Sequence, residues 1–166
     1  RLPIKTYTTA DGLAQNSVNR IVRDSRGFLW FCTDEGLSRF DGYTFTNYTT
    51  ADGLPHPMVR SFLETRSGIY WVGTYYGVAR FNPKGRPPSA VGRQSSGAGP
   101  DIELTDGRRT TEMFALHNPK DDSKTGTVNM LLEDRAGVIW AGAGRGLYRL
   151  DQTNGEWSLR VVEIGL

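Results

Sequence analysis

Short apolar runs alternate with polar, glycine-containing turns along most of this chain. In residues 14–48, tight turns at 24–27, 34–36 and 41–42 separate runs rich in aromatic and aliphatic residues. Aspartate bonds to the local backbone and glycine accepts a positive φ, so both favour tight reversals. Short strands joined in this way pair antiparallel. The pattern predicts a four-stranded sheet with strands at 18–24, 28–33, 37–40 and 43–48.

The second predicted strand is apolar on both of its faces. Side chains alternate between faces along a strand, so a strand exposed on one side would alternate apolar with polar residues. The sheet is therefore expected to be buried between two neighbouring sheets. One face would carry Phe28, Trp30 and Cys32, and the other Leu29, Phe31 and Thr33.

The four-strand pattern is repeated. The sequence Thr-Thr-Ala-Asp-Gly-Leu of residues 8–13 returns unchanged at 49–54, and Trp30 returns as Trp71 at the same offset. A third copy, after an interruption, carries Trp140. Repeats of roughly 40–50 residues that hold four short strands are typical of β-propeller blades. The expected fold class is all-β, with three four-stranded antiparallel blades in an incomplete ring.

The repeats define the segments of one partial propeller domain, residues 1–166. Residues 1–8 align with the fourth strand of the first copy, so they are expected to form an orphan outer strand. The insert at 84–110 is rich in Pro, Gly and Ser, which favours a flexible loop. The blades are expected at 14–48, at 55–83 with an outer strand from within 111–117, and at 125–164.

Three blades cannot close a ring, because propellers close with about four to eight blades. The outermost blade flanks would be apolar, and exposed apolar flanks and unpaired strand edges drive association. The chain begins at Arg1 rather than Met, as expected of a processed or excised piece. The protein is therefore expected to be a homo-oligomer or the remainder of a longer propeller. Residues 4–8 would then pair with a blade that lacks its own fourth strand.

Composition and charge exclude several functional classes. The 166 residues are 37% hydrophobic and 23% charged, with a net charge of +2. The basic residues are scattered, so neither nucleic acid nor an anionic membrane surface is an expected partner. No apolar run approaches the roughly 18 residues that cross a bilayer, so this segment is expected to make no direct membrane contact.

Several conspicuous residues are expected to be structural. Tryptophan at one fixed register in each repeat favours packing between blades over ligand binding. Cys32 occupies the position of Gly73 and Gly142, so a buried, unreactive thiol is expected. The glycine-rich residues 142–146 align with a tight turn and precede no helix, which argues against a phosphate-binding loop.

No cofactor or metal is expected. His56 and His117 are the only histidines, and neither has a second ligand at zinc spacing. Asp121 and Asp122 lack the alternating spacing of a calcium loop. A glycosidase needs two convergent carboxylates about 5–9.5 Å apart. No motif indicates such a pair, and the sequence alone does not exclude one.

These repeats resemble the two-component regulator propeller family. The shared features are a Gly-Leu loop, a Val-Asn pair, an acidic turn ending in glycine, a tryptophan strand and a Gly-Leu-x-Arg-Phe-Asp run. The chain departs from this pattern at Cys32, where the family has glycine, and at Thr65, where the other copies have aspartate. In the first copy the matching residues are 12–13, 18–19, 24–27, 29–30 and 36–41.

The resemblance implies a function as well as a fold. In that family such blades form the periplasmic sensing region of membrane-anchored sensor kinases, and several respond to carbohydrates. It thus implies a periplasmic, non-catalytic sensor propeller of a two-component protein that binds an unknown small molecule or oligosaccharide, with any kinase activity in a separate downstream region. The alternative is a fragment of a propeller enzyme, a lyase or glycosidase, that acts on polysaccharide.

Ligand contacts are expected from loops, because the strands are used for packing. The loops between blades and the turns after each second strand can line one rim of a propeller. Tyr75 and Tyr76 stand out, since two aromatic residues in a turn could stack on a sugar ring; packing on the neighbouring loop is the structural alternative. The other candidate ligand-binding residues are Asn16, Asp34, Glu35, His56 and Arg145.

Overall fold

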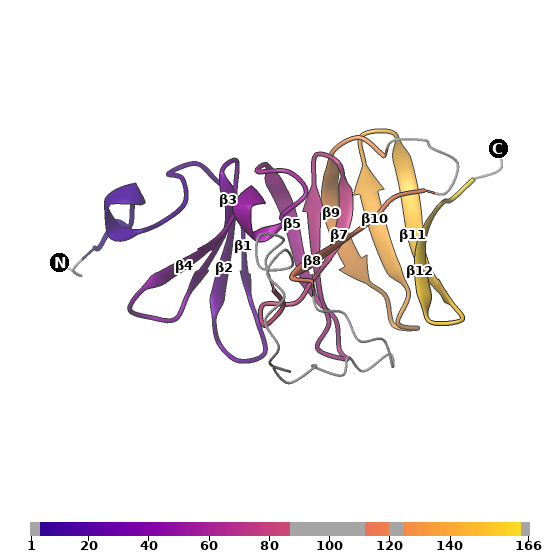
Figure 1. The fold of residues 1–166 in the computed structure, drawn as a ribbon, viewed down its shortest axis with the longest axis horizontal. Helices are drawn as coiled ribbons and strands as arrows, with labels where there is room; N and C mark the ends of the chain where they lie inside the picture. The colour runs from indigo at the N-terminus through magenta and orange to yellow at the C-terminus, as the bar shows by residue number, and fades with distance from the viewer. Residues whose placement is uncertain (1–3, 87–111, 120–124, 164–166) are drawn as a thin grey trace, which may run out of the picture.

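A computed structural model describes residues 4–86, 112–119 and 125–163, and it contains three four-stranded antiparallel sheets side by side (Figure 1). The predicted all-β fold with three propeller blades is confirmed. Blade 1 comprises β1 (Val18–Arg23), β2 (Leu29–Thr33), β3 (Gly36–Phe40) and β4 (Phe45–Tyr48). Blade 2 comprises β5 (Val59–Glu64), β6 (Tyr70–Thr74), β7 (Gly77–Phe81) and β8 (Phe114–His117). Blade 3 comprises β9 (Val128–Glu133), β10 (Ile139–Ala143), β11 (Gly146–Thr153) and β12 (Glu156–Val161).

The repeated hexapeptide forms the same 3-10 turn twice, as η1 (Thr9–Asp11) and η2 (Thr50–Asp52). In each copy a threonine hydroxyl caps the turn and the aspartate reaches back to the threonine backbone N–H. This reciprocal capping satisfies backbone donors that the short turn leaves free. Identical sequence therefore produces identical entry into blades 1 and 2.

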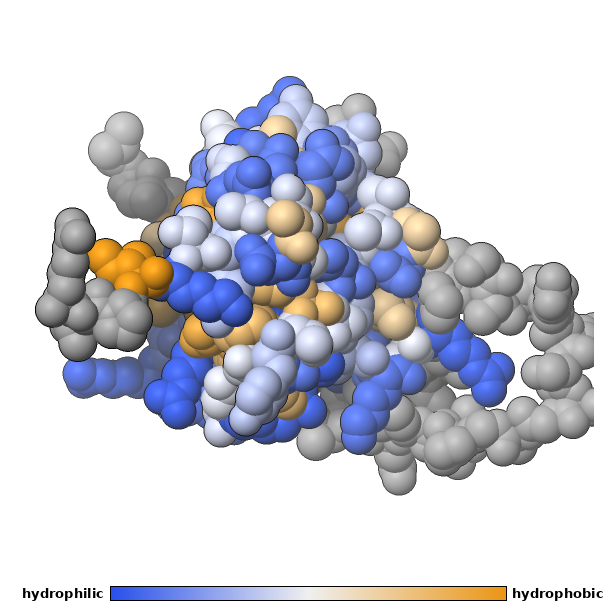
Figure 2. All heavy atoms as spheres, turned by 90° about the vertical axis from the view of Figure 1, so that its left-hand side faces the viewer, coloured by the Kyte–Doolittle hydropathy of each residue, from blue (hydrophilic) through white to orange (hydrophobic). Residues whose placement is uncertain are grey.

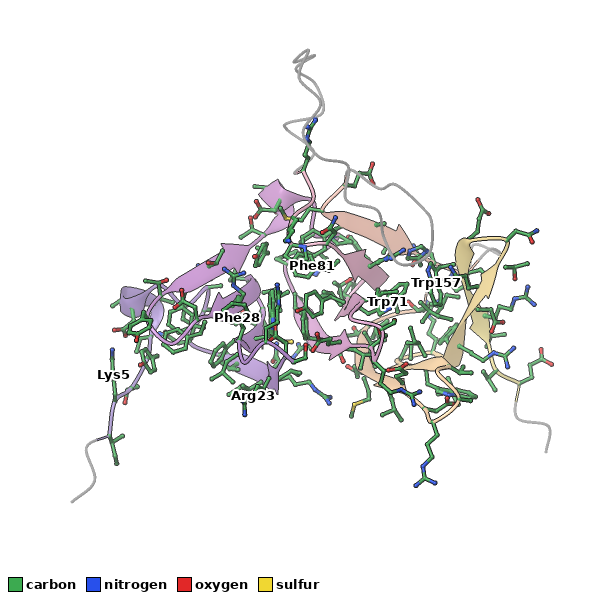
Figure 3. The ribbon with its side chains drawn as sticks, turned by 90° about the horizontal axis from the view of Figure 1, so that it is seen from below. Lys5, Arg23, Phe28, Trp71, Phe81 and Trp157 are labelled. Atoms are coloured by element: carbon green, nitrogen blue, oxygen red, sulfur yellow. The ribbon has the colours of Figure 1, made fainter. Side chains whose placement is uncertain are left out.

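Two apolar cores lie between the blades. Trp30, from β2, is fully buried against Phe62 of β5 at a ring distance of 4.6 Å. Trp71 of β6 is fully buried in the second core, where its ring lies 5.1 Å from that of Trp157. Figure 3 shows Phe81 between the first two sheets, and Trp71 and Trp157 between the second and third. Trp30 and Trp71 therefore pack between blades, as the sequence predicts.

The third tryptophan of the series behaves differently. Trp140 of β10 is only half-buried, because it lies on the face of blade 3 that points away from blade 2 and meets no further described blade. Its indole still donates to Asp134 at 2.9 Å, as Trp30 does to Asp24. The hydrogen bond between tryptophan and aspartate within a blade thus forms even where no described sheet covers that face.

Cys32 is buried, and burial raises the pKa of its thiol to about 12. A thiol with so high a pKa carries almost no thiolate at neutral pH, and the thiolate is the reactive species. At the equivalent position, Gly73 leaves no room for a side chain, since an added Cβ would lie 2.9 Å from Val128 Cγ1. The size of the residue at this position is therefore limited by the next blade. The limiting strand is β5 at Cys32 and β9 at Gly73.

The two segments expected as outer strands differ in the structure. The outer strand of blade 2, β8, lies within the predicted 111–117 range and pairs with β7. Residues 4–8, expected as an orphan outer strand, belong to no sheet, because no described strand pairs with them. Most of the insert predicted at 84–110 lies outside the described residues; its described entry and exit meet at the bridge between Arg86 and Glu112.

Candidate functional site

Three equivalent turns lie at one rim of the row of blades. They connect β2 with β3, β6 with β7, and β10 with β11, and they hold the residue pairs 34–35, 75–76 and 144–145. In the second turn the Thr74 hydroxyl accepts a hydrogen bond from the Tyr76 N–H and donates to the Gly77 carbonyl. The third turn has Ala143 in place of threonine, and its backbone N–H groups instead donate to the carbonyls of Thr127 and Thr125. These bonds tie it to the loop that precedes β9.

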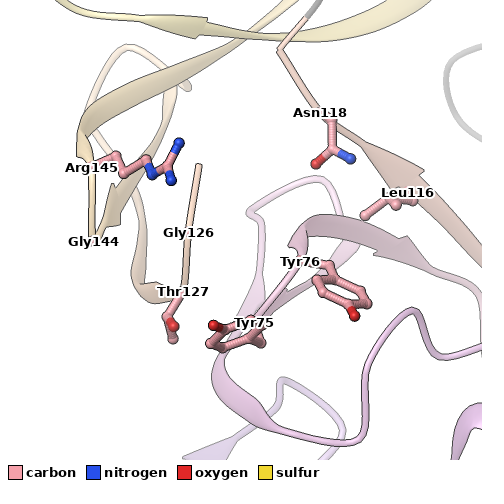
Figure 4. Close-up of a pocket in the computed structure, with 8 residues that line it drawn as sticks. All are labelled: Tyr75, Tyr76, Leu116, Asn118, Gly126, Thr127, Gly144 and Arg145. Atoms are coloured by element: carbon pink, nitrogen blue, oxygen red, sulfur yellow. The ribbon is translucent and has the colours of Figure 1, made fainter. Parts of the chain in front are cut away.

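A pocket of about 600 Å³ opens between the second and third of these turns (Figure 4). Its walls come from four places: the β6–β7 turn, the end of β8, the loop before β9 and the β10–β11 turn. The pocket therefore depends on the packing of blade 3 against blade 2. It is lined by Tyr75, Tyr76, Leu116, Asn118, Gly126, Thr127, Gly144 and Arg145.

The two tyrosines form the aromatic wall of the pocket. Tyr75 and Tyr76 are 48% and 54% exposed, although both rings pack on His56, at 5.0 and 4.7 Å. His56 is itself held in place, because its Nδ1 accepts a hydrogen bond from the Met58 N–H at 3.1 Å. The two tyrosine rings thus pack on the preceding loop through His56 and still leave about half of their surface exposed to the pocket. His56 supports the wall from behind and does not line the pocket.

Arg145 and Asn118 supply the polar groups. Figure 4 shows the Arg145 side chain directed into the space between its own turn and Asn118. Among the described residues Arg145 forms no ion pair, and its guanidinium donates no hydrogen bond to them. A guanidinium offers several fixed donors and no acceptor. It is therefore available to bind an acceptor or an anion that enters the pocket.

The remaining predicted residues lie apart from this pocket, along the blade 1 part of the rim. Asn16 accepts a hydrogen bond from the Thr9 N–H at 2.8 Å, which fixes the loop before β1. Asp34 accepts from Asn19 at 2.8 Å and forms an ion pair with Arg60 at 3.5 Å. Glu35 is exposed. The structure thus brings Tyr75, Tyr76 and Arg145 together, with His56 behind them.

Sequence reasoning missed the contribution of β8. Leu116 lies in β8 and Asn118 directly follows that strand; both come after the insert, which interrupts the repeat offset that located the other turns. Gly126 and Thr127 belong to the loop before β9. This is one of the loops between blades that the sequence places at the rim. No sequence signal placed the end of β8 beside Arg145.

The described residues hold no candidate metal site. Among them, no group of three or more His, Cys, Asp and Glu side chains is placed to hold a metal ion. The helices in the same residues are neither long nor apolar enough to cross a membrane. His117 packs on Trp71 at a ring distance of 5.4 Å.

Comparison with known families agrees with the repeats. Residues 12–35 and 53–76 match the family described as two component regulator propeller. The matched residues hold β1 and β2 of blade 1 and β5 and β6 of blade 2, and the resemblance deduced from the residues is confirmed. Histidine kinase P4 of Formosa agariphila is 51% identical over 41 residues, which are 25% of this chain and 3% of that protein.

Solved structures share the fold. An extracellular domain of the hybrid two component system BT3049 from B. thetaiotaomicron aligns with a TM-score of 0.61 and 20% identity, over 87% of this chain and 17% of that one. The corresponding domain of BT4673, from the same organism, gives 0.55 and 22%, over 86% and 18%. This chain thus spans less than a fifth of the length of either domain.

Proposed function

We propose that this chain is part of the ligand-binding sensor region of a two-component signalling protein, and that the region lies outside the cytoplasm, in the periplasm, in a membrane-anchored protein. Two observations support the proposal. The chain carries two-component regulator propeller repeats, and its structural relatives are described as extracellular domains of two-component systems. Signal output would come from a part of the protein outside these residues.

The observation that carries the binding role is the pocket between blades 2 and 3. Half-exposed Tyr75 and Tyr76 provide aromatic faces, and Arg145 and Asn118 provide donors and an acceptor across from them. Sites for small ligands combine apolar walls with a few convergent polar groups, at about 300–1,000 Å³. An oligosaccharide fits this chemistry, because a sugar ring has an apolar face for stacking and hydroxyl groups for hydrogen bonds.

The lining favours binding over catalysis. Glycoside hydrolysis needs two carboxyl groups about 5–9.5 Å apart. The described residues that line this pocket include neither aspartate nor glutamate. The proposed role is therefore non-catalytic recognition, in preference to a glycosidase activity.

Calorimetric titration of the intact sensor region tests the proposal, with a panel of neutral and uronic-acid-containing oligosaccharides as the probes. Tyr75→Ala combined with Tyr76→Ala should weaken the tightest of these complexes by at least tenfold. Tyr43→Ala is the matched control, because Tyr43 is 92% exposed in the β3–β4 turn and away from the pocket. Unchanged binding by the double variant, or cleavage of a glycan by the intact protein, whether by hydrolysis or by elimination, would refute the proposal.

A further inference from the structure

The charge of the rim changes sign along the row of blades. The turn of blade 1 carries two carboxylates, at Asp34 and Glu35, and the equivalent turn of blade 3 carries the guanidinium of Arg145. Between them, the turn of blade 2 carries the uncharged Tyr75 and Tyr76. Figure 2 looks along the row from the blade 1 end and shows mainly hydrophilic residues along the upper edge. The pocket between blades 2 and 3 therefore lies at the positive end of the rim.

The carboxylate of Asp34 is neutralised across the interface of blades 1 and 2. Arg60 forms an ion pair with it at 3.5 Å and donates to the Asn19 side chain at 2.7 Å. Asn19 in turn donates to Asp34 at 2.8 Å. At the corresponding positions between blades 2 and 3 stand Tyr75, Arg60 and Asn129. None of these three residues is acidic, so the repeat places no counter-charge for a cation at this second interface.

Arg145 is held at its base, and its guanidinium has no partner among the described residues. Its backbone N–H donates to the Thr125 carbonyl at 3.2 Å. Its aliphatic stem passes Gly126, where an added Cβ would lie 3.6 Å from the Arg145 Cγ. The guanidinium points into the pocket (Figure 4), and the described residues that line the pocket include neither aspartate nor glutamate. A cation that its surroundings do not neutralise attracts an anion.

We propose that the ligand of this pocket is an acidic oligosaccharide, and that Arg145 binds its carboxylate or sulfate group. The inference rests on the proposed function, because it names the class of ligand for the same pocket. Both acidic groups present pairs of oxygens that accept two parallel hydrogen bonds from a guanidinium. Such charge-assisted bonds are about twice as strong as bonds between neutral groups.

The rest of the pocket fits the uncharged part of such a ligand. Tyr75 and Tyr76 offer aromatic faces for a sugar ring, and the side chains of Asn118 and Thr127 offer donors and acceptors for its hydroxyl groups. A neutral oligosaccharide would use the same contacts, but it would displace water from the Arg145 guanidinium without supplying an opposite charge. The acidic group therefore determines which oligosaccharide binds best.

Calorimetry with matched pairs of ligands tests the inference on the intact sensor region. One pair is trigalacturonate and its neutral methyl ester, and the other is a sulfated galactan oligosaccharide and its desulfated form. The acidic member of one pair should bind about tenfold more tightly than its neutral partner, and the pair that shows this difference identifies the acidic group. Arg145→Gln should remove the preference by weakening only the acidic ligand. Arg135→Gln, in the β9–β10 turn on the opposite rim, should preserve it.

Equal affinities within both pairs, or equal weakening of the acidic and neutral members by Arg145→Gln, would overturn the inference. Either result leaves the proposed function in place as long as Tyr75→Ala combined with Tyr76→Ala still weakens the complex. If the tyrosine variant binds like the native protein while Arg145→Gln removes the preference, the stacking role is wrong and the recognition of the acidic group stands. Absence of binding by all four ligands would count against both.

Discussion

The indole Nε1 of Trp30 donates a hydrogen bond of 3.0 Å to the Asp24 carboxylate, and both side chains are buried where blades 1 and 2 meet. The hydroxyl of Tyr70, from blade 2, donates to the same carboxylate oxygen at 2.9 Å. One carboxylate thus satisfies a donor in its own blade and another in the next. The arrangement links the fold within a blade to the packing between blades.

Blade 2 lacks this bond, and its repair should stabilise the protein. Thr65 stands where blades 1 and 3 have aspartate, and the buried Nε1 of Trp71 has no hydrogen-bond partner among the described residues. A buried unsatisfied donor costs about 1–3 kcal/mol. Thr65→Asp should therefore raise the free energy of unfolding by about 1 kcal/mol in urea titrations.

The reverse change is the control for that experiment. Asp24→Thr leaves Trp30 and Tyr70 without their acceptor, so it should lower the free energy of unfolding by about 1–3 kcal/mol. A Thr65→Asp chain less stable than the native one would show that the buried charge costs more than the new bond contributes.

Acid should destabilise the interface of blades 1 and 2 through Asp24. Burial raises the pKa of Asp24, but hydrogen bonds from Trp30, Tyr70 and the Phe28 N–H outweigh it and hold the pKa below the ordinary value. A lowered folded-state pKa stabilises the fold fully above the unfolded-state pKa of about 3.9, and this contribution is lost as the pH falls through the folded-state value.

The measurement is the urea midpoint from pH 6 down to pH 2.5, for the native chain and for Asp24→Asn. The native chain should lose more stability below about pH 4 than the variant does. Parallel curves for the two chains would mean that Asp24 has the same pKa in the folded and unfolded states.

The small-residue position of β6 and β10 should show unequal tolerance. A Cβ at Gly73 would lie 2.9 Å from Val128 Cγ1, whereas at Gly142 the nearest neighbour, Met130 Cβ, is 3.7 Å away. Gly73→Ala should lower the free energy of unfolding by about 1–3 kcal/mol because of overpacking. Gly142→Ala should stay within about 0.5 kcal/mol of the native value. Equal losses in thermal unfolding would place the two glycines in equally tight packing.

Arg145 should contribute to ligand affinity without contributing to stability. Arg145→Gln removes an exposed cation that forms no ion pair within the described residues, so the unfolding midpoint should not change. The affinity for the best oligosaccharide of the panel should fall about tenfold, or about 1.4 kcal/mol. Arg135→Gln, an exposed arginine on the opposite rim, should leave it unchanged. Equal effects of both substitutions would indicate a general loss of charge.

Repetition explains how much of the fold was predictable. The strands around Trp30 and Trp71 share one register and are apolar on both faces, so strand order and interblade packing could be inferred from several copies at once. The strand β8 lies within the predicted range 111–117, but its contribution to the pocket could not be inferred, because the insert before it breaks the repeat offset. Trp140 is half-buried for a reason outside its own repeat, namely the absence of a described blade on its far side.

The candidate site was predictable only in its turns. Tyr75, Tyr76 and Arg145 occupy equivalent turns, so the sequence placed them on one rim. Asp34 occupies the same position in blade 1, but Arg60 and Asn19 engage it in contacts between blades. Which rim residues remain available for a ligand depends on side-chain partners that only the folded structure reveals.

A crystal structure of the intact sensor region with its tightest-binding oligosaccharide would show whether the pocket between blades 2 and 3 holds the ligand. The expected result is a sugar ring stacked on Tyr75 or Tyr76, with Arg145 donating to the ligand between blades 2 and 3. A ligand bound elsewhere, with these three side chains untouched, would contradict it.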